Sequence, residues 1–128
     1  MPTKTIKVHV SSNNDRGGVL SVRVTPWRVH LDKKDVVEWQ FGDGEANNDM
    51  AWFRVEQTDP SKPWPFNPPT PPDASYTAFA PNGTVTATKN DGANPLKDVI
   101  SYGLTIGFLD DAKQLRTMYI DPDMIVDS

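Results

Sequence analysis

The 128-residue sequence predicts one all-β domain, built as a sandwich or barrel of short strands. Apolar and polar residues alternate with a period of two in several runs, which is the pattern of strands with one buried side. No segment keeps a helical period for long, and clusters of Asn, Asp and Gly separate the runs as turns do. A chain of this length can bury a core without covalent staples, so residues 1–128 are expected to form a single domain.

The alternating runs place the expected strands. Successive side chains of a strand point to opposite faces, so each run is expected to have a buried side and a solvent side. The clearest runs cover residues 6–10, 20–24, 27–31, 37–41 and 102–108. Weaker runs cover residues 53–55, 84–88 and 117–120, and residues 110–113 are expected to form a hairpin tip. Together these runs predict seven or eight short strands.

Residues 59–73 differ from the rest because they hold seven of the twelve prolines. Proline lacks a backbone N–H and fixes φ, so this segment is expected to be a long proline-rich loop and not a central strand. Aromatic residues in and beside it are the partner-binding candidates: Trp52, Trp64, Phe66 and Tyr76. If exposed, they would form an apolar patch for a protein or sugar partner. If folded back, they would close an open end of the sandwich, and this second alternative is favoured because long loops often carry their own clusters.

The charge balance disfavours nucleic acid as a partner. The chain has 13 Lys and Arg against 17 Asp and Glu, a net charge of −4, and its basic residues are scattered. A nucleic-acid binder needs a clustered basic face, and an anionic membrane surface attracts basic segments. The first residues contain no apolar signal core, and no apolar run is long enough to span a membrane. We therefore expect a cytoplasmic protein, with an exported domain that has lost its signal peptide as the alternative.

Two segments resemble a cupredoxin-type domain. In the first, within residues 22–41, a polar turn leads into residues 35–39 (Asp-Val-Val-Glu-Trp), similar to an Asp-x-Val-x-Trp strand of that family. The second joins residues 102–108 to residues 120–126 and resembles the closing strands of cupredoxin-like domains. The segments cover about a third of the chain. The resemblance implies a two-sheet Greek-key sandwich.

The copper site of that family does not carry over to this chain. A blue-copper site uses two His, a Cys and commonly an axial Met. This chain has no Cys, and no His lies between residues 102 and 126. The absence of Cys also excludes disulfides, thiol chemistry and Cys-based zinc sites. The resemblance therefore implies a scaffold without copper, and no cofactor is expected.

Other candidate metal sites are weaker. Alternation places His9 and His30 on the solvent side of their strands, away from any cluster of ligands. The loop after residue 42 carries oxygen ligands at alternate positions, which makes a loose calcium site the one metal candidate. Its residues are Asp43, Glu45, Asn47 and Asp49. An EF-hand is excluded, because Asn48 and Arg54 stand where that loop needs Gly and Glu.

Neighbouring acids offer a catalytic alternative. Glycosidases use two carboxylates that flank a sugar bond, and the pairs Asp110–Asp111 and Asp121/Asp123 could supply them. Their places in turns and on opposite strand faces favour a solubilising role. Residues 82–84 match a glycosylation sequon but favour a turn that leads into a strand. No Gly-x-Ser-x-Gly nucleophile motif is present.

These observations predict a non-catalytic binding or assembly module. A protein partner or self-association into a homo-oligomer is the expected interaction, through a sheet edge or the proline-rich loop. The alternatives are a carbohydrate-active enzyme that uses carboxylates in a surface groove, and a calcium-stabilised module.

Overall fold

The computed structural model describes residues 3–13, 19–42, 50–91, 98–110 and 112–126. Within these residues the chain forms ten strands in two sheets that pack together, and its helical structure is a single 3₁₀ turn, Ala74–Tyr76. The predicted all-β sandwich is confirmed. In the described part of the chain, no helix is long and apolar enough to cross a membrane.

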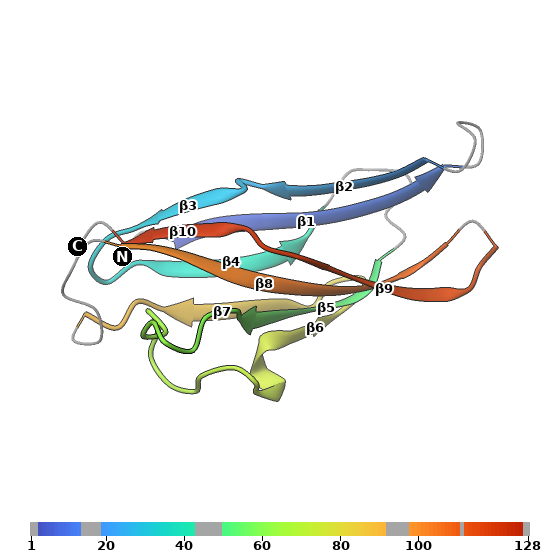
Figure 1. Cartoon of the computed structure of the whole chain (residues 1–128). Helices are drawn as coiled ribbons and strands as arrows, with labels where there is room; N and C mark the ends of the chain where they lie inside the picture. The colour runs from blue at the N-terminus through green and yellow to red at the C-terminus, as the bar shows by residue number, and fades with distance from the viewer. Residues whose placement is uncertain (1–2, 14–18, 43–49, 92–97, 111, 127–128) are drawn as a thin grey trace.

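The first sheet has four strands in the order β2-β1-β4-β7. Its strands are β1 (Thr3–Asn13), β2 (Val19–Thr25), β4 (Val36–Phe41) and β7 (Thr84–Thr88). Strand β1 runs antiparallel to β2 and parallel to β4, and β4 runs antiparallel to β7. This sheet lies behind the other in Figure 1, where its central strands have the paler colours.

The second sheet has six strands, five of them in the order β3-β10-β8-β5-β6. They are β3 (Arg28–Leu31), β10 (Asp123–Val126), β8 (Asp98–Leu109), β5 (Met50–Gln57) and β6 (Thr77–Phe79). The sixth, β9 (Leu115–Ile120), pairs with the second half of β8, while β10 pairs with the first half. Figure 1 shows β9 and β10 following each other along the same side of β8.

The core lies between the sheets and is filled by alternate residues of the strands, as the period of two predicts. On β4 the odd-numbered positions 37, 39 and 41 are buried, and on β8 the even-numbered positions from 100 to 108 are. The largest fully buried side chains are Trp39, Tyr102, Phe53, Ile6, Leu31 and Leu104. Burial of this apolar surface is the main stabilising contribution to the fold.

The proline-rich loop packs back against the sandwich. Trp64 and Phe66 are only 6% and 2% exposed, and Tyr76 is buried beside them. The ring of Phe66 contacts Trp39 edge-on at a centroid distance of 5.8 Å, and Trp39 contacts Tyr102 in the same way. The loop thus adds an aromatic cluster that continues into the core, which agrees with the second of the two alternatives for these side chains.

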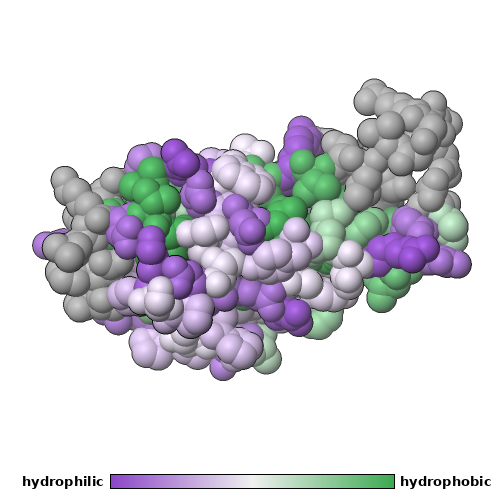
Figure 2. Space-filling model, viewed as in Figure 1, coloured by the Kyte–Doolittle hydropathy of each residue, from purple (hydrophilic) through white to green (hydrophobic). Residues whose placement is uncertain are grey.

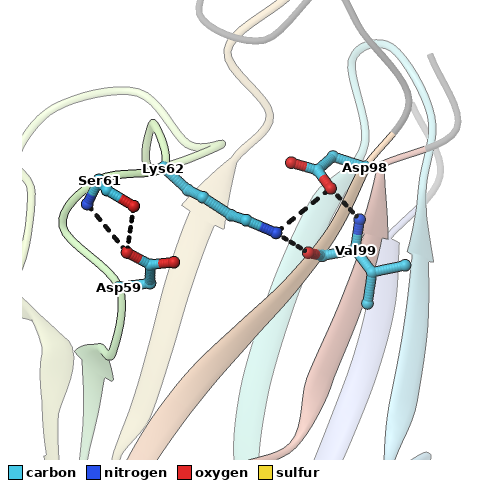
Figure 3. A network of polar contacts seen from close by, with 5 residues as sticks. All are labelled: Asp59, Ser61, Lys62, Asp98 and Val99. Carbon is cyan, nitrogen blue, oxygen red and sulfur yellow. Dashed lines mark hydrogen bonds and ion pairs between the residues drawn. The ribbon is translucent and has the colours of Figure 1, made fainter.

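Polar contacts fix the start of this loop to the start of β8 (Figure 3). The Lys62 Nζ atom donates to the backbone oxygen of Val99 at 2.8 Å and lies 3.3 Å from the Asp98 carboxylate. The Asp59 carboxylate accepts a hydrogen bond from the backbone N–H of Ser61 at 3.0 Å and closes the local turn. That bond and one from the Ser61 hydroxyl lower the pKa of Asp59. These polar contacts close the turn at residues 59–62 and hold it against the sheet.

His9 departs from the alternation prediction. His30 is exposed as expected, whereas His9 is 6% exposed. The chain leaving β4 lies against its ring, because a Cβ atom at Gly42 would be 3.1 Å from the His9 Cβ and 3.4 Å from its Cδ2. The prediction that His9 faces solvent is therefore wrong, since the period of two cannot show that another segment covers the outer side of a strand.

Candidate binding surface on the six-stranded sheet

The outer face of the six-stranded sheet carries the side chains that do not enter the core. On β5, Phe53 and Val55 are buried, while Trp52, Arg54 and Glu56 alternate with them and point outward. Residues directly paired across strands share a face. The outer face therefore extends across β6, β5, β8 and β9. Trp52 on β5 is paired with positions 79 and 107, and position 105 on β8 is paired with position 119 on β9.

This face gathers most of the exposed apolar surface of the described residues. Among the described residues six large apolar or aromatic side chains are exposed, and five of them lie on this outer face. Val99 lies at one end of β8, and the other four lie together toward the opposite end. These four are Phe79 at 66% exposure, Leu115 at 59%, Tyr119 at 50% and Leu109 at 39%. Together with the half-buried Trp52 they form what we call the outer-face patch. Figure 2, viewed toward this sheet, shows apolar and intermediate side chains among polar ones.

Two glycines of β8 shape the patch. A Cβ atom at Gly107 would lie 2.2 Å from the Trp52 Nε1 atom, and one at Gly103 would lie 2.3 Å from the Tyr119 hydroxyl. Both distances are too short for real contacts, so glycine is what allows these aromatic side chains to lie close against the strand. The aromatic side chains in turn cover the backbone that a glycine leaves open.

The polar centre of the face is a closed network. Arg54 Nε donates to Glu56 Oε1 at 3.0 Å, and the hydroxyl of Thr105 donates to the other carboxylate oxygen. The Arg54 guanidinium also lies 5.5 Å from the centroid of the Trp52 ring, within reach of a cation–π interaction. The positive and negative charges at the centre of the patch therefore compensate each other.

Tyr119 shows how the face combines aromatic and polar character. Its side chain is half exposed, but its hydroxyl lies over Gly103. Burial raises its pKa to about 12, and the negative charges of Asp121 and Glu56 add to the effect. The ring therefore stays neutral and offers its open side to a partner at any physiological pH.

All three tyrosines are expected to ionise late, which gives a prediction for alkaline titration. Burial raises the pKa of Tyr76 and of Tyr102 above the ordinary value of 10.0, as it does for Tyr119. A raised pKa means that the folded chain holds the phenolic proton longer than the unfolded chain, so the stability this contributes is present below about pH 10 and lost as the pH rises toward the folded pKa values.

The measurement is near-ultraviolet phenolate absorbance recorded together with circular dichroism. The absorbance is expected to stay low up to about pH 10 and to rise only above it, with Tyr119 ionising near pH 12 or on unfolding. Ionisation centred at pH 10 in a chain that keeps its native circular dichroism would contradict the burial of these hydroxyls.

The candidates predicted from sequence fall in different places. Trp52 belongs to the outer-face patch, whereas the other three aromatic candidates are buried. Those three form their own contacts: Trp64 Nε1 donates to the Tyr76 hydroxyl at 3.0 Å, and its ring lies 5.5 Å from that of Phe66. The calcium candidates Asp43, Glu45, Asn47 and Asp49 lie outside the described residues.

The acids considered for catalysis are engaged in local structure. Asp110 accepts hydrogen bonds at 2.9 Å from the backbone of Ala112 and of Gln114 and from the Arg116 side chain, which closes the predicted hairpin tip and lowers the pKa of Asp110. Asp123 pairs with Arg28 at 3.0 Å. Asp111 lies outside the described residues. The sequon at residues 82–84 lies in the turn between β6 and β7, as predicted.

An open groove of about 480 Å³ runs beside the patch, between β5 and the end of the proline-rich loop. Its acids are Glu56 and Asp73. Glu56 is held by its two partners, and the pKa of Asp73 is lowered by hydrogen bonds from Ser75. A glycosidase needs one carboxylic acid with a raised pKa, so these two acids fit a structural role better. Among the described residues, no group of three or more His, Cys, Asp or Glu could hold a metal ion.

Most residues of the outer-face patch were not predicted from the sequence. Trp52 was recognised as a candidate, but Phe79, Leu109, Leu115 and Tyr119 were not. A sequence feature that could have indicated the patch is the hairpin tip predicted at residues 110–113. A hairpin there brings two outward residues, Leu109 and Leu115, opposite each other. Comparison of the sequence with protein-family models and with curated proteins found no match.

Proposed function

We propose that the chain is a non-catalytic assembly module, on a copper-free cupredoxin-like scaffold, that binds a second copy of itself through the outer-face patch. One observation carries this proposal: four of the six exposed large apolar side chains of the described residues lie together at one end of the outer face of the six-stranded sheet. Exposed apolar groups that gather in this way mark interaction surfaces. Aromatic residues and arginine, both present here, are enriched in interface cores.

The charge of the face supports a second copy as the partner. The whole chain carries a net charge of −4, so two copies repel each other at long range. The five side chains of the patch carry no charge, and the charged pair beside them, Arg54 and Glu56, is compensated internally. A two-fold interface uses the same patch on both copies, and a neutral apolar patch meets itself without placing like charges together.

The scaffold part of the proposal rests on the resemblance of two segments to cupredoxin-type domains. Those segments form β2, β3 and β4 at one place in the chain and β8 and β10 at another. The chain contains no Cys to complete a copper site. The carboxylates of Glu56, Asp73, Asp110 and Asp123 are engaged in hydrogen bonds or ion pairs, which favours binding over hydrolysis.

Light scattering of matched variants tests the proposal. Leu115→Asp places a charge in the patch and is expected to raise the dissociation constant of the dimer about tenfold or more, the equivalent of about 1.4 kcal/mol. Val99→Asp is the control, because Val99 is exposed to a similar degree, 47%, on the same strand as Leu109. It lies ten residues away along β8, roughly 33 Å at the rise of a strand.

The expected result is a concentration-dependent dimer for the natural chain and for Val99→Asp, and a monomer at the same concentrations for Leu115→Asp. A natural chain that stays monomeric at every accessible concentration, or equal masses for the two variants, would overturn the proposal.

A further inference from the structure

The strand β9 has one free edge in the described part of the chain. It pairs with β8 through all six of its residues, and no other described strand pairs with it. Its second row of backbone N–H and C=O groups is therefore available to another strand. The strand contains no proline, and its ladder with β8 has no register shift. Proline and a β-bulge, two devices that commonly protect a sheet edge, are therefore absent from this strand.

The edges formed by β6, β3 and β7 are better protected than β9. Strand β6 has three residues and is followed by Pro81, and β3 has four. The end of β7 is bridged to the proline-rich loop through Phe66 and Lys89. Strand β9 does carry a charged side chain, Arg116, but its guanidinium is paired with Asp110 at 2.9 Å. Strand β6 also carries a residue of the outer-face patch, Phe79, but β9 combines a six-residue free edge with two exposed side chains of the patch, Leu115 and Tyr119.

The alternation of side chains limits how β9 can pair with a copy of itself. Positions 115, 117 and 119 point outward with their partners on β8, and positions 116 and 118 point toward the core side. Paired residues must share a face, so a symmetric antiparallel pair is centred on a residue and not between two. Centring on Met118 would place Leu115 opposite Asp121 of the second copy. Centring on Thr117 places Leu115 opposite Tyr119 of the second copy instead.

We propose that two copies pair antiparallel along β9, with Thr117 of each chain opposite Thr117 of the other. This register sets an apolar residue against an aromatic one twice, at Leu115 and Tyr119, and a threonine against a threonine at the centre. Cross-strand pairs of both kinds stabilise antiparallel sheets. The two six-stranded sheets become one continuous sheet, and the two outer-face patches lie side by side on it.

This inference rests on the proposed function, because it takes the second copy as the partner and adds the mode of contact. It narrows the contact to the β9 side of the patch. Phe79 lies on β6, two strands away from β8 and on the side opposite to β9, so it stays outside an edge-to-edge interface. Phe79 is the most exposed side chain of the patch in the single chain. In a face-to-face dimer, by contrast, it would become buried.

Disulfide trapping tests the register. The chain has no Cys, so a single introduced thiol can only cross-link two copies. Under mild oxidation Thr117→Cys is expected to become a covalent dimer as its main species, and a reductant is expected to reverse it. Thr84→Cys is the matched control, because Thr84 is an exposed threonine on the edge strand β7. Equal cross-linking of the two variants would overturn the pairing along β9.

A second variant separates the two proposals. If β9 edges pair, Phe79→Asp leaves the mass in light scattering unchanged while Leu115→Asp dissociates the dimer. If both substitutions dissociate it and Thr117→Cys does not cross-link, the patch associates face to face, which overturns the edge pairing and leaves the assembly function standing. A chain that is monomeric in every form overturns both.

Discussion

Replacing Trp64 with alanine is expected to lower the free energy of unfolding by about 3–5 kcal/mol, the range for a large buried aromatic side chain. Trp64 is 6% exposed, and its ring meets Phe66 and Tyr76 edge-on at 5.5 and 5.8 Å. Its Nε1 atom donates to the Tyr76 hydroxyl, which itself donates to the backbone oxygen of Pro69 at 2.7 Å. The substitution removes this buried apolar area, two ring contacts and one hydrogen bond together.

The measurement is urea unfolding followed by far-ultraviolet circular dichroism, which does not depend on the tryptophan removed. Trp27→Ala serves as the control, because the Trp27 side chain is 47% exposed and its loss is expected to change stability by less than about 1 kcal/mol. Similar losses for the two variants would contradict the packing of the proline-rich loop. Serine at Trp64 or Phe66 is likewise expected to act on the stability of each copy, since neither ring lies on the outer-face patch.

The sandwich could be predicted from the sequence because burial in a strand is a local property. Alternate residues of 102–108 face inward whatever the partner strands are, and the structure confirms this for Tyr102, Leu104 and Ile106. The neighbouring runs at 20–24 and 27–31 were both predicted as strands, but their pattern does not show that β2 and β3 belong to different sheets. The short strand β6 was missed, since three residues carry too little pattern, and β10 was indicated only by the resemblance of residues 120–126 to a closing strand.

The candidate site depended on contacts that the local pattern does not contain. Trp52 lies over Gly107, 55 positions farther along the chain, only because β5 and β8 pair in one particular register. Leu109 and Leu115 share a face because the hairpin between them sets the register of β9. A period of two shows which residues of one strand face outward, but it does not show which outward residues of different strands meet.

The second prediction with a large expected effect on stability concerns Asp35, in the turn between β3 and β4. Asp35 is 1% exposed, and its carboxylate accepts a hydrogen bond at 2.8 Å from the backbone N–H of Asp32. The same carboxylate lies 2.8 Å from the Lys4 Nζ atom at the start of β1. The backbone oxygen of Asp35 accepts a hydrogen bond from Lys89 N–H at 2.8 Å. One buried acid thus joins a turn, the first strand and the end of β7.

Asp35→Ala is expected to cost about 2–3 kcal/mol in the free energy of unfolding, because it leaves the backbone N–H of Asp32 without its acceptor and removes the nearest carboxylate from the Lys4 ammonium. Urea unfolding measures the loss. Asp32→Ala is the control: that carboxylate is 61% exposed and 3.8 Å from the same ammonium, so its removal is expected to cost no more than about 1 kcal/mol. Equal losses at the two positions would mean that burial of Asp35 does not govern its contribution.

Asp35→Asn then separates the two interactions of the carboxylate. The asparagine side-chain oxygen can still accept from the backbone N–H of Asp32, but it carries no charge for Lys4. If the turn hydrogen bond dominates, Asn recovers most of the stability that Ala loses, and the recovery does not depend on salt. If the ion pair dominates, Asn is nearly as unstable as Ala, and the difference between Asp and Asn shrinks as salt screens the part-exposed ammonium. The 1% exposure of Asp35 and the 30% exposure of Lys4 favour the first result, because the ammonium can regain water while the turn donor cannot.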